Sequence, residues 1–253
     1  MKTNNYKKKI HLVEFFKIKF CNLNDSDFRI LMKKTGLFVF PSGPGLATID
    51  KDKKYHKALQ NSDYVFFDSG YFVLLLKLLK DIKVKKFSGY LFIKFLIKHF
   101  KKSKDVKLLS VDPSLELSKN NYDFFLKLGL KNQKIFNYIA PKYNDKNISD
   151  KKLLKIVKNI KPDYILINIG GGVQEILGYY LKDKIKIKSK IICTGAAISF
   201  FTGDQAPLNK FFDDFSMGWL IRIFYNPKIF FLRYFKAIRL YKLVNNNKVY
   251  IRN

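Results

Sequence analysis

Apolar residues along this chain form short, mainly uninterrupted runs, and the segments between the runs alternate apolar and polar positions with a helical period. Apolar runs of about four to eight residues are typical of strands that are buried on both faces, as in a parallel sheet. These runs predict strands at residues 37–40, 64–67, 108–111, 134–139, 164–167 and 190–194. The segments between them predict helices at residues 71–79, 90–100, 116–128, 149–160 and 173–181.

Strands that alternate with helices of this length are joined by right-handed crossovers and form a parallel sheet. The expected fold class is therefore α/β, a Rossmann-like parallel sheet with helices on both faces, in one catalytic domain at residues 1–215. Residues 9–21 alternate imperfectly and predict a strand or one arm of a hairpin before this series. A short helix up to Lys34 and a helical stretch up to Ala58 are also expected.

The charge of the chain changes near its end. Residues 216–253 contain eight basic residues and no acidic one, so we expect a basic, helical C-terminal appendage there, without which the rest stays folded. Residues 228–244 follow Pro227 without a helix breaker and predict a helix. This helix is expected to lie on an anionic membrane, or to pack on the protein's core or on another subunit. Its apolar arc would consist of Phe230, Phe231, Tyr234, Ala237, Ile238, Tyr241 and Val244.

Composition narrows the class of protein. A content of 47% hydrophobic and 16% aromatic residues excludes a disordered chain. The formal charge of +29 favours a polyanionic partner, although a solvated lysine surface explains part of it equally well. Cys21 and Cys193 are expected to be reduced and buried, as in a cytoplasmic protein. Charged residues interrupt the apolar run after the basic start, and every apolar run is far below the ~20 residues of a spanning helix, so neither a signal peptide nor a membrane span is predicted.

Three glycines, Gly170 to Gly172, follow the strand at residues 164–167 and precede Gln174 and Glu175, which open a helix. Glycines at the carboxyl end of a strand let the backbone approach a ligand, and free N–H groups in the first helical turn suit phosphate. Ligands of open α/β sheets bind at this edge. The alternative is a glycine turn without a ligand, since the spacing is not G-x-G-x-x-G.

Other loops follow the predicted strands in the same way. The sequence PSGPG at residues 41–45 is too rigid and too small for a helix or a strand, and IAPKY and TGAA end at Tyr143 and Ala197. Asp68 stands at the tip of the strand at residues 64–67. Two interpretations of Asp68 remain equal, a cap of the next helix and a carboxylate that faces a cleft.

A metal site is poorly supported, because the three histidines are scattered and the two cysteines lie far apart. Asp50 and Asp52 match a D-x-D pattern, but they enter a helical segment with lysines at positions 51, 53 and 54. An exposed turn is the better interpretation. A nucleophilic triad also lacks a histidine near a serine or cysteine loop.

Together these loops resemble the WecG/TagA/CpsF family, glycosyltransferase family 26, best over residues 47–233. GGGVQE is similar to the family's G-x-P-x-Q-E, and FFDSG is similar to its P-D-G. IAPKY stands where the family has G-Y, and MGWLIRIFYNP looks like L-E-W-L-x-R-L-x-x-P. These motifs place family functional residues at Asp68, Tyr143, Gln174, Glu175, Arg222 and Arg233.

The chain also departs from the family's motifs. The family's T-x-N falls on Phe40 and Ser42, and its R-x-x-G arginine falls on Lys86. An aspartate after the last strand becomes Ser199, and the glutamate before the tryptophan becomes Gly218. The R-A-P run is shortened to residues 205–207. The identities of the donor sugar and of the acceptor are therefore open.

The resemblance implies inverting transfer, without metal or cofactor, of an N-acetylhexosamine-type sugar such as N-acetylmannosamine. The donor would be a UDP-sugar and the acceptor a polyprenyl-diphosphate-linked sugar, in cell-surface polysaccharide synthesis at the inner face of the membrane. Asp68 would be the catalytic base, which a carboxylate at a strand tip can be. Arg222 and Arg233 would bind the lipid diphosphate. The expected substrate-binding residues are Ser42, Gly43, Lys86, Tyr143, Gly170, Gly171, Gly172, Gln174, Glu175 and Gly195.

Two other classes stay open. A nucleotide-dependent oxidoreductase of Rossmann type would use the same sheet, but its G-x-G-x-x-G and its acidic ribose ligand are missing. A nucleic-acid-binding protein would explain the charge, yet no recognised motif is present, so specific nucleic-acid binding is not expected. A homo-oligomer is possible in each case.

Overall fold

The computed structural model describes residues 10–23, 27–103, 105–143, 148–185, 188–204 and 238–252. The strands are β1 (His11–Phe15), β2 (Ile18–Asn22), β3 (Gly36–Val39), β4 (Tyr64–Phe66), β5 (Leu108–Asp112), β6 (Ile135–Ile139), β7 (Tyr164–Ile167), β8 (Lys190–Cys193) and β9 (Val249–Arg252). The helices are α1 (Phe28–Met32), α2 (Gly43–Leu46), α3 (Lys53–Gln60), α4 (Gly70–Lys80), α5 (Gly89–Lys102), α6 (Leu115–Lys127), α7 (Lys151–Ile160), α8 (Val173–Lys184), α9 (Ser199–Thr202) and α13 (Arg239–Asn246).

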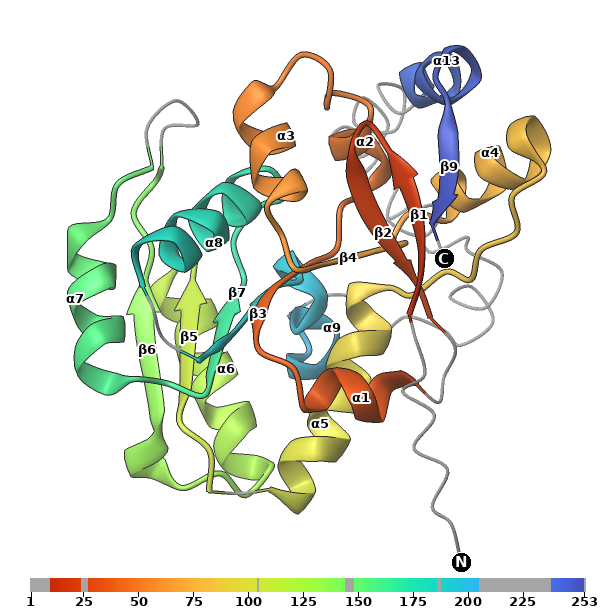
Figure 1. Cartoon of the computed structure of the whole chain (residues 1–253). Coiled ribbons are helices and arrows are strands. Elements are labelled where there is room, and N and C mark those ends of the chain that lie inside the picture. Colours follow the sequence, from red (N-terminus) through yellow and green to blue (C-terminus); the bar gives the residue numbers. More distant parts are fainter. Residues whose placement is uncertain are drawn as a thin grey trace, which may run out of the picture.

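The strands form one nine-stranded sheet in the order β6-β5-β7-β8-β3-β4-β2-β1-β9 (Figure 1). Neighbours from β6 to β2 are parallel, and the β2–β1 and β1–β9 pairs are antiparallel. The predicted α/β, Rossmann-like sheet is confirmed, and the six predicted buried strands end within one residue of the observed bounds.

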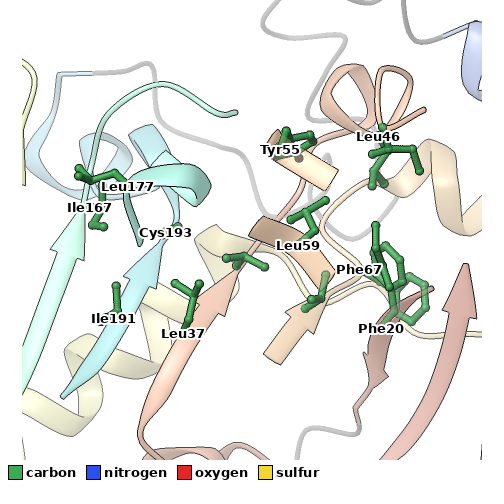
Figure 2. Close-up of a cluster of buried hydrophobic side chains, with 14 of the residues drawn as sticks. Phe20, Leu37, Leu46, Tyr55, Leu59, Phe67, Ile167, Leu177, Ile191 and Cys193 are labelled. Atoms are coloured by element: carbon green, nitrogen blue, oxygen red, sulfur yellow. The ribbon is translucent and has the colours of Figure 1, made fainter. Parts of the chain in front are cut away.

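Helices cover both faces of the sheet (Figure 1). One core lies under α2, α3, α4, α7, α8 and α13, which we call the α8 face; the other lies under α1, α5 and α6, the α5 face. Alternate residues of a strand enter alternate cores, so Ile165 and Ile167 of β7 face α8 while Leu166 faces α5. Figure 2 shows part of the α8-face core, where strand side chains meet Leu177 of α8 and Leu59 of α3.

The crossovers explain which face each helix covers. The chain moves outward from β5 to β6 through α6 on the α5 face, and it moves inward from β7 to β8 through α8 on the α8 face. Right-handed crossovers in opposite directions must use opposite faces. Because β5 and β7 are neighbours, the connections that leave them diverge at their carboxyl ends. Ligands of open α/β sheets bind at such a point.

The N-terminal hairpin is confirmed as β1 and β2. Its two turn residues, Phe16 and Lys17, both have positive φ, 52° and 59°. Two such residues match the right-handed twist of a hairpin. The prediction for residues 41–45 was wrong, because Gly43 to Leu46 form the short helix α2, for which the Ser42 hydroxyl accepts a hydrogen bond from the Gly45 N–H.

The described end of the chain packs on the sheet. β9 pairs with β1, and the Nζ atom of Lys80 on α4 donates to the Asn245 carbonyl of α13 at 3.0 Å. Residues 228–237 of the predicted helix lie outside the described residues. Of the predicted apolar arc, Ile238 and Tyr241 are 57% and 45% exposed and Val244 is buried, so the alternative that the arc packs on the protein's core holds for Val244 only. Packing against α2 and α4 turns another side of α13 inward, so that the residues buried are Leu240, Leu243 and Val244.

Cys21 and Cys193 are both free and buried, as predicted. Among the described residues, no helix is long and apolar enough to cross a membrane.

Candidate active site

The loops that follow β3, β4 and β8 meet at the carboxyl edge of the sheet. A Cβ atom on Gly43 would lie 2.8 Å from the Ser69 hydroxyl, so the loop after β3 approaches the loop after β4 more closely than any other residue would allow. A Cβ on Gly89 would lie 3.3 Å from Cβ of Thr194, at the end of β8. The N-terminus of α5 therefore joins this group of loops.

Asp68 stands in the centre of this arrangement. Its Oδ1 accepts a hydrogen bond of 2.8 Å from the N–H of Gly89, the first residue of α5. The cap of α4 is Ser69, whose hydroxyl accepts from the Phe72 N–H, so the interpretation of Asp68 as the cap of that helix was wrong. The positive end of α5 favours the ionised carboxylate, and a half-buried carboxylate at this edge can accept a proton.

Gln174 and Glu175 connect the loops after β7 and β8. The Glu175 carboxylate accepts from the Gly172 N–H at 2.6 Å and from the Gln174 side-chain amide at 3.0 Å. The side-chain oxygen Oε1 of Gln174 in turn accepts a hydrogen bond from the Gly195 N–H at 2.7 Å. Both side chains are buried, 3% and 1% exposed, so here they bind main chain and fix the two loops.

The glycine loop, Gly170 to Gly172, has an open side. Gly170 and Gly171 are exposed, and a Cβ on Gly170 or Gly172 would meet no atom within 4 Å. Gly172 has φ of 92°, a conformation that side chains other than glycine rarely adopt. Open backbone at the start of the twelve-residue helix α8 is suited to an anionic ligand.

The family model described as "Glycosyl transferase WecG/TagA/CpsF family" matches residues 13–252, which include the strand-end loops described above. The chain belongs to this family. It is therefore a glycosyltransferase of cell-surface polysaccharide synthesis. No curated protein matches the chain significantly.

Burial within this glycosyltransferase raises the pKa of Glu175 from 4.5 to about 7. Hydrogen bonds from Gln174 and Gly172 oppose the rise, and the negative charge of Asp68 adds to it. The Glu175 carboxyl therefore lies within range of the Asp68 charge. A protonated Glu175 would reduce the negative charge beside the site.

The raised pKa of Glu175 predicts a pH-dependent stability. The folded state holds a proton that the unfolded state releases, so this contribution is full below about pH 4.5 and is lost as the pH rises through about 7. The difference corresponds to about 3 kcal/mol. Urea denaturation from pH 4 to 8 should show this fall for the wild type but not for Glu175→Gln. The exposed Glu116→Gln is the control, and a wild-type slope in both variants would contradict the assignment.

The other predicted site residues include some that the structure describes and some that lie outside the described residues. Lys86 is half-buried. It lies next to the end of β4, because the N–H of the following residue, Phe87, donates a hydrogen bond to the Phe67 carbonyl at 2.9 Å. Ser199 is buried at the start of α9. Other predicted residues lie outside the described residues, namely Arg222, Arg233, Gly218 and residues 205–207.

Tyr143 follows the edge strand β6, which β5 separates from β7. Its hydroxyl donates to Oδ2 of Asp150 at 2.6 Å, and the Tyr138 hydroxyl donates to the same atom at 2.7 Å. Asp150 also caps α7 through the Leu153 N–H. Burial and the Asp150 charge raise the pKa of Tyr143 above its ordinary value. In the described structure Tyr143 therefore fixes α7, and the structure does not bring it to the loops around Asp68.

The D-x-D pattern does not form a pair of free carboxylates. The Arg239 guanidinium of α13 binds both carboxylate oxygens of Asp50 and lowers the pKa of Asp50. Asp52 caps α3 by accepting from the Tyr55 N–H at 2.9 Å. Within the described ranges, His, Cys, Asp and Glu side chains do not form a group that could hold a metal ion.

A buried polar cluster at the carboxyl end of β5 could not be predicted from the sequence. Asp112, at the end of β5, is fully buried and accepts hydrogen bonds from Asn121 and Asn168. The signal was weak, because asparagine is common throughout the chain and these residues lie far apart in it.

Proposed function

We propose that this glycosyltransferase moves an N-acetylhexosamine-type sugar from a UDP-sugar to a polyprenyl-diphosphate-linked sugar, with inversion and without a metal ion. The observation that carries the proposal is the Asp68 carboxylate, held against the N-terminus of α5 among the loops that follow β3, β4 and β8. Direct displacement requires at least a base for the acceptor hydroxyl and, beside it, a site that binds the leaving diphosphate.

In the proposed reaction, Asp68 takes the proton of the acceptor hydroxyl. That oxygen forms a bond with the anomeric carbon from the face opposite to UDP. The bond between this carbon and the phosphate oxygen breaks, and UDP leaves with the electron pair. One displacement inverts the configuration of the anomeric carbon.

The leaving diphosphate requires positive potential. Main-chain N–H groups of the glycine loop and the N-terminus of α8 can supply it. Lys86, beside the end of β4, can add a full charge, and Arg222 and Arg233 are proposed for the lipid diphosphate. These groups make a metal ion unnecessary in the proposal.

Donor binding is tested by thermal unfolding in excess EDTA. UDP at about 100 times its Kd should raise Tm by several degrees, whereas NAD and oligonucleotides should not, because the chain lacks the G-x-G-x-x-G and acidic ribose ligand of NAD sites and a recognised nucleic-acid motif. A shift with NAD instead would indicate an oxidoreductase. A UDP shift that needs Mg²⁺ or Mn²⁺ would contradict metal independence.

We also propose that the enzyme contacts the anionic inner face of the cell membrane. Six of the eight large hydrophobic side chains that are exposed in the described residues lie on α4, α13 and β9. We call five of them the α4–α13 surface: Leu74, Leu78, Ile238, Tyr241 and Ile251. Tyr250 points to the other face of β9, because Val249 packs on the α8-face core and strand side chains alternate. Lys77 on α4, Lys242 on α13 and Lys248 are exposed on the same elements or next to them. Apolar side chains among lysines suit the headgroup region of an anionic leaflet.

The membrane proposal predicts that Leu78→Asp with Tyr241→Asp reduces sedimentation with anionic vesicles about tenfold or more, because it adds charge to an apolar contact. Leu115→Asp, at a 71% exposed position on α6 and the opposite face, is the matched control. High salt should weaken wild-type binding. Equal binding of the two variants to the vesicles would contradict the proposed contact between the α4–α13 surface and the membrane. Self-association without vesicles, lost only in the double variant, would assign the surface to a second copy instead.

A further inference from the structure

The carboxylate of Asp112 is fully buried at the end of β5. Its Oδ1 accepts from the Ser110 hydroxyl at 2.8 Å, the Asn121 amide at 2.7 Å and the Asn168 amide at 2.8 Å. Its Oδ2 accepts from the Asn137 amide at 3.3 Å. Burial raises the pKa of Asp112, and these donors oppose the rise. A carboxylate buried so deeply is costly unless several donors satisfy it, and these donors come from three different elements of the fold as well as from the residue after β7.

The place of this cluster in the fold suggests its purpose. Asp112 ends β5 and Asn168 follows β7, and these neighbouring strands send their helices to opposite faces of the sheet. The cluster therefore lies at the carboxyl ends of β5 and β7 where their connections diverge, which is the place where ligands of open α/β sheets bind.

Asn168 is the link from this cluster to the glycine loop. Its main-chain N–H donates to the Val111 carbonyl at 2.9 Å, and its side-chain amide donates both to Asp112 and, at 3.0 Å, to the Ser110 hydroxyl. Three hydrogen bonds thus attach residue 168 to β5. The first glycine of the loop stands two positions later.

The far end of the glycine loop is held separately, by the bond from the Gly172 N–H to Glu175. Between the two attachments, Gly170 and Gly171 are exposed and have no side chains to pack, and the Gly170 carbonyl accepts a hydrogen bond from the Gln174 N–H at 3.1 Å. Glycine loses more conformational freedom on ordering than any other residue. Fixing both ends therefore favours a single conformation of the loop.

We propose that Asp112 is a positioning residue of the donor site, which acts through Asn168 to hold the glycine loop in the conformation that receives the donor diphosphate. This rests on the proposed donor role of that loop. A preformed loop avoids the ordering cost at the moment of binding, so the effect appears in donor affinity. Chemistry at Asp68 is unaffected once the donor is bound.

Asn168→Ala and Asn121→Ala form a matched pair. Each removes one buried amide donor from the same Asp112 oxygen, and in the described structure the side-chain oxygen of each lacks a hydrogen-bond partner. Only Asn168 continues into the glycine loop. Asn168→Ala should raise the Kd for UDP about tenfold with kcat at saturating donor within about threefold, whereas Asn121→Ala should change Kd less than about twofold.

Hydrogen exchange of the amides of residues 169–173 is a second readout, independent of any ligand. Exchange should accelerate in Asn168→Ala and not in Asn121→Ala. Equal exchange and equal Kd in the two variants would overturn the proposal, even if both are destabilised. Should Asn168→Ala not fold, Ser110→Ala removes one of the two side-chain bonds of Asn168 and should give the same two effects at smaller size. Unchanged hydrogen exchange and an unchanged Kd for UDP in Ser110→Ala would then overturn the proposal.

The proposed function and this inference fail separately. Wild-type enzyme that binds no UDP would refute the donor site, while the exchange rates would still report whether Asp112 and Asn168 hold the loop. Wild-type enzyme that binds UDP, with Asn168→Ala indistinguishable from it, would refute the inference alone.

Discussion

Asp68→Asn is expected to reduce sugar transfer by about 10² to 10⁴-fold while leaving the affinity for the UDP-sugar within about threefold. Asparagine keeps an oxygen that can accept from the Gly89 N–H, so the position of the side chain and the N-terminus of α5 should be preserved. What is lost is the ability to accept a proton from the acceptor hydroxyl.

The measurement is initial-rate kinetics with separate variation of donor and acceptor, together with donor titration. Asp123→Asn, the same change at an exposed position on α6, is the control and should leave all parameters unchanged. Turnover near that of the wild type would mean that Asp68 only supports α5 and that the base lies elsewhere. A large loss of donor affinity would assign Asp68 to donor binding instead.

Leu240→Ala is expected to lower the free energy of unfolding by about 2 to 5 kcal/mol, the usual cost of a cavity left by a buried leucine. Leu240 is fully buried in the α8-face core, although it belongs to the C-terminal part of the chain. Tyr241→Ala, on the 45% exposed side of the same helix, should change this free energy by less than about 0.5 kcal/mol.

Urea denaturation of the two variants decides how the end of the chain is attached. Equal, small effects would mean that α13 is only loosely associated. The expected difference instead makes α13 and β9 part of the fold, so that a chain shortened by residues 227–253 would lose three buried aliphatic side chains and a sheet strand. We therefore no longer expect that truncated chain to remain stably folded.

The sequence was sufficient to predict the elements of the parallel sheet. The run at residues 164–167 has the bounds of β7, and the alternation of residues 9–21 led to the hairpin of β1 and β2. Such predictions succeed because burial on one or both faces is expressed in consecutive residues. The positions of Asp68 and of the glycine loop at strand ends followed from the same local patterns.

Contacts between distant residues could not be predicted in this way. Asp68 binds a helix that begins 21 residues later, Gln174 binds the N–H of Gly195, and Arg239 of α13 binds Asp50. Each of these side chains had a plausible local interpretation, as a cap, a substrate ligand or a surface charge. Only the order of strands in the sheet brings the partners together.

The sequence by itself therefore determined the α/β class, the strand ends at which the candidate site lies and the family whose motifs occupy them. The tertiary structure decided the rest: the carboxylate of Asp68 points to α5, Glu175 is buried, and Asp112 with Asn168 supports the glycine loop. The physical reason is that periodicity records which residues are buried. Hydrogen-bond partners depend on which loops the crossovers place side by side.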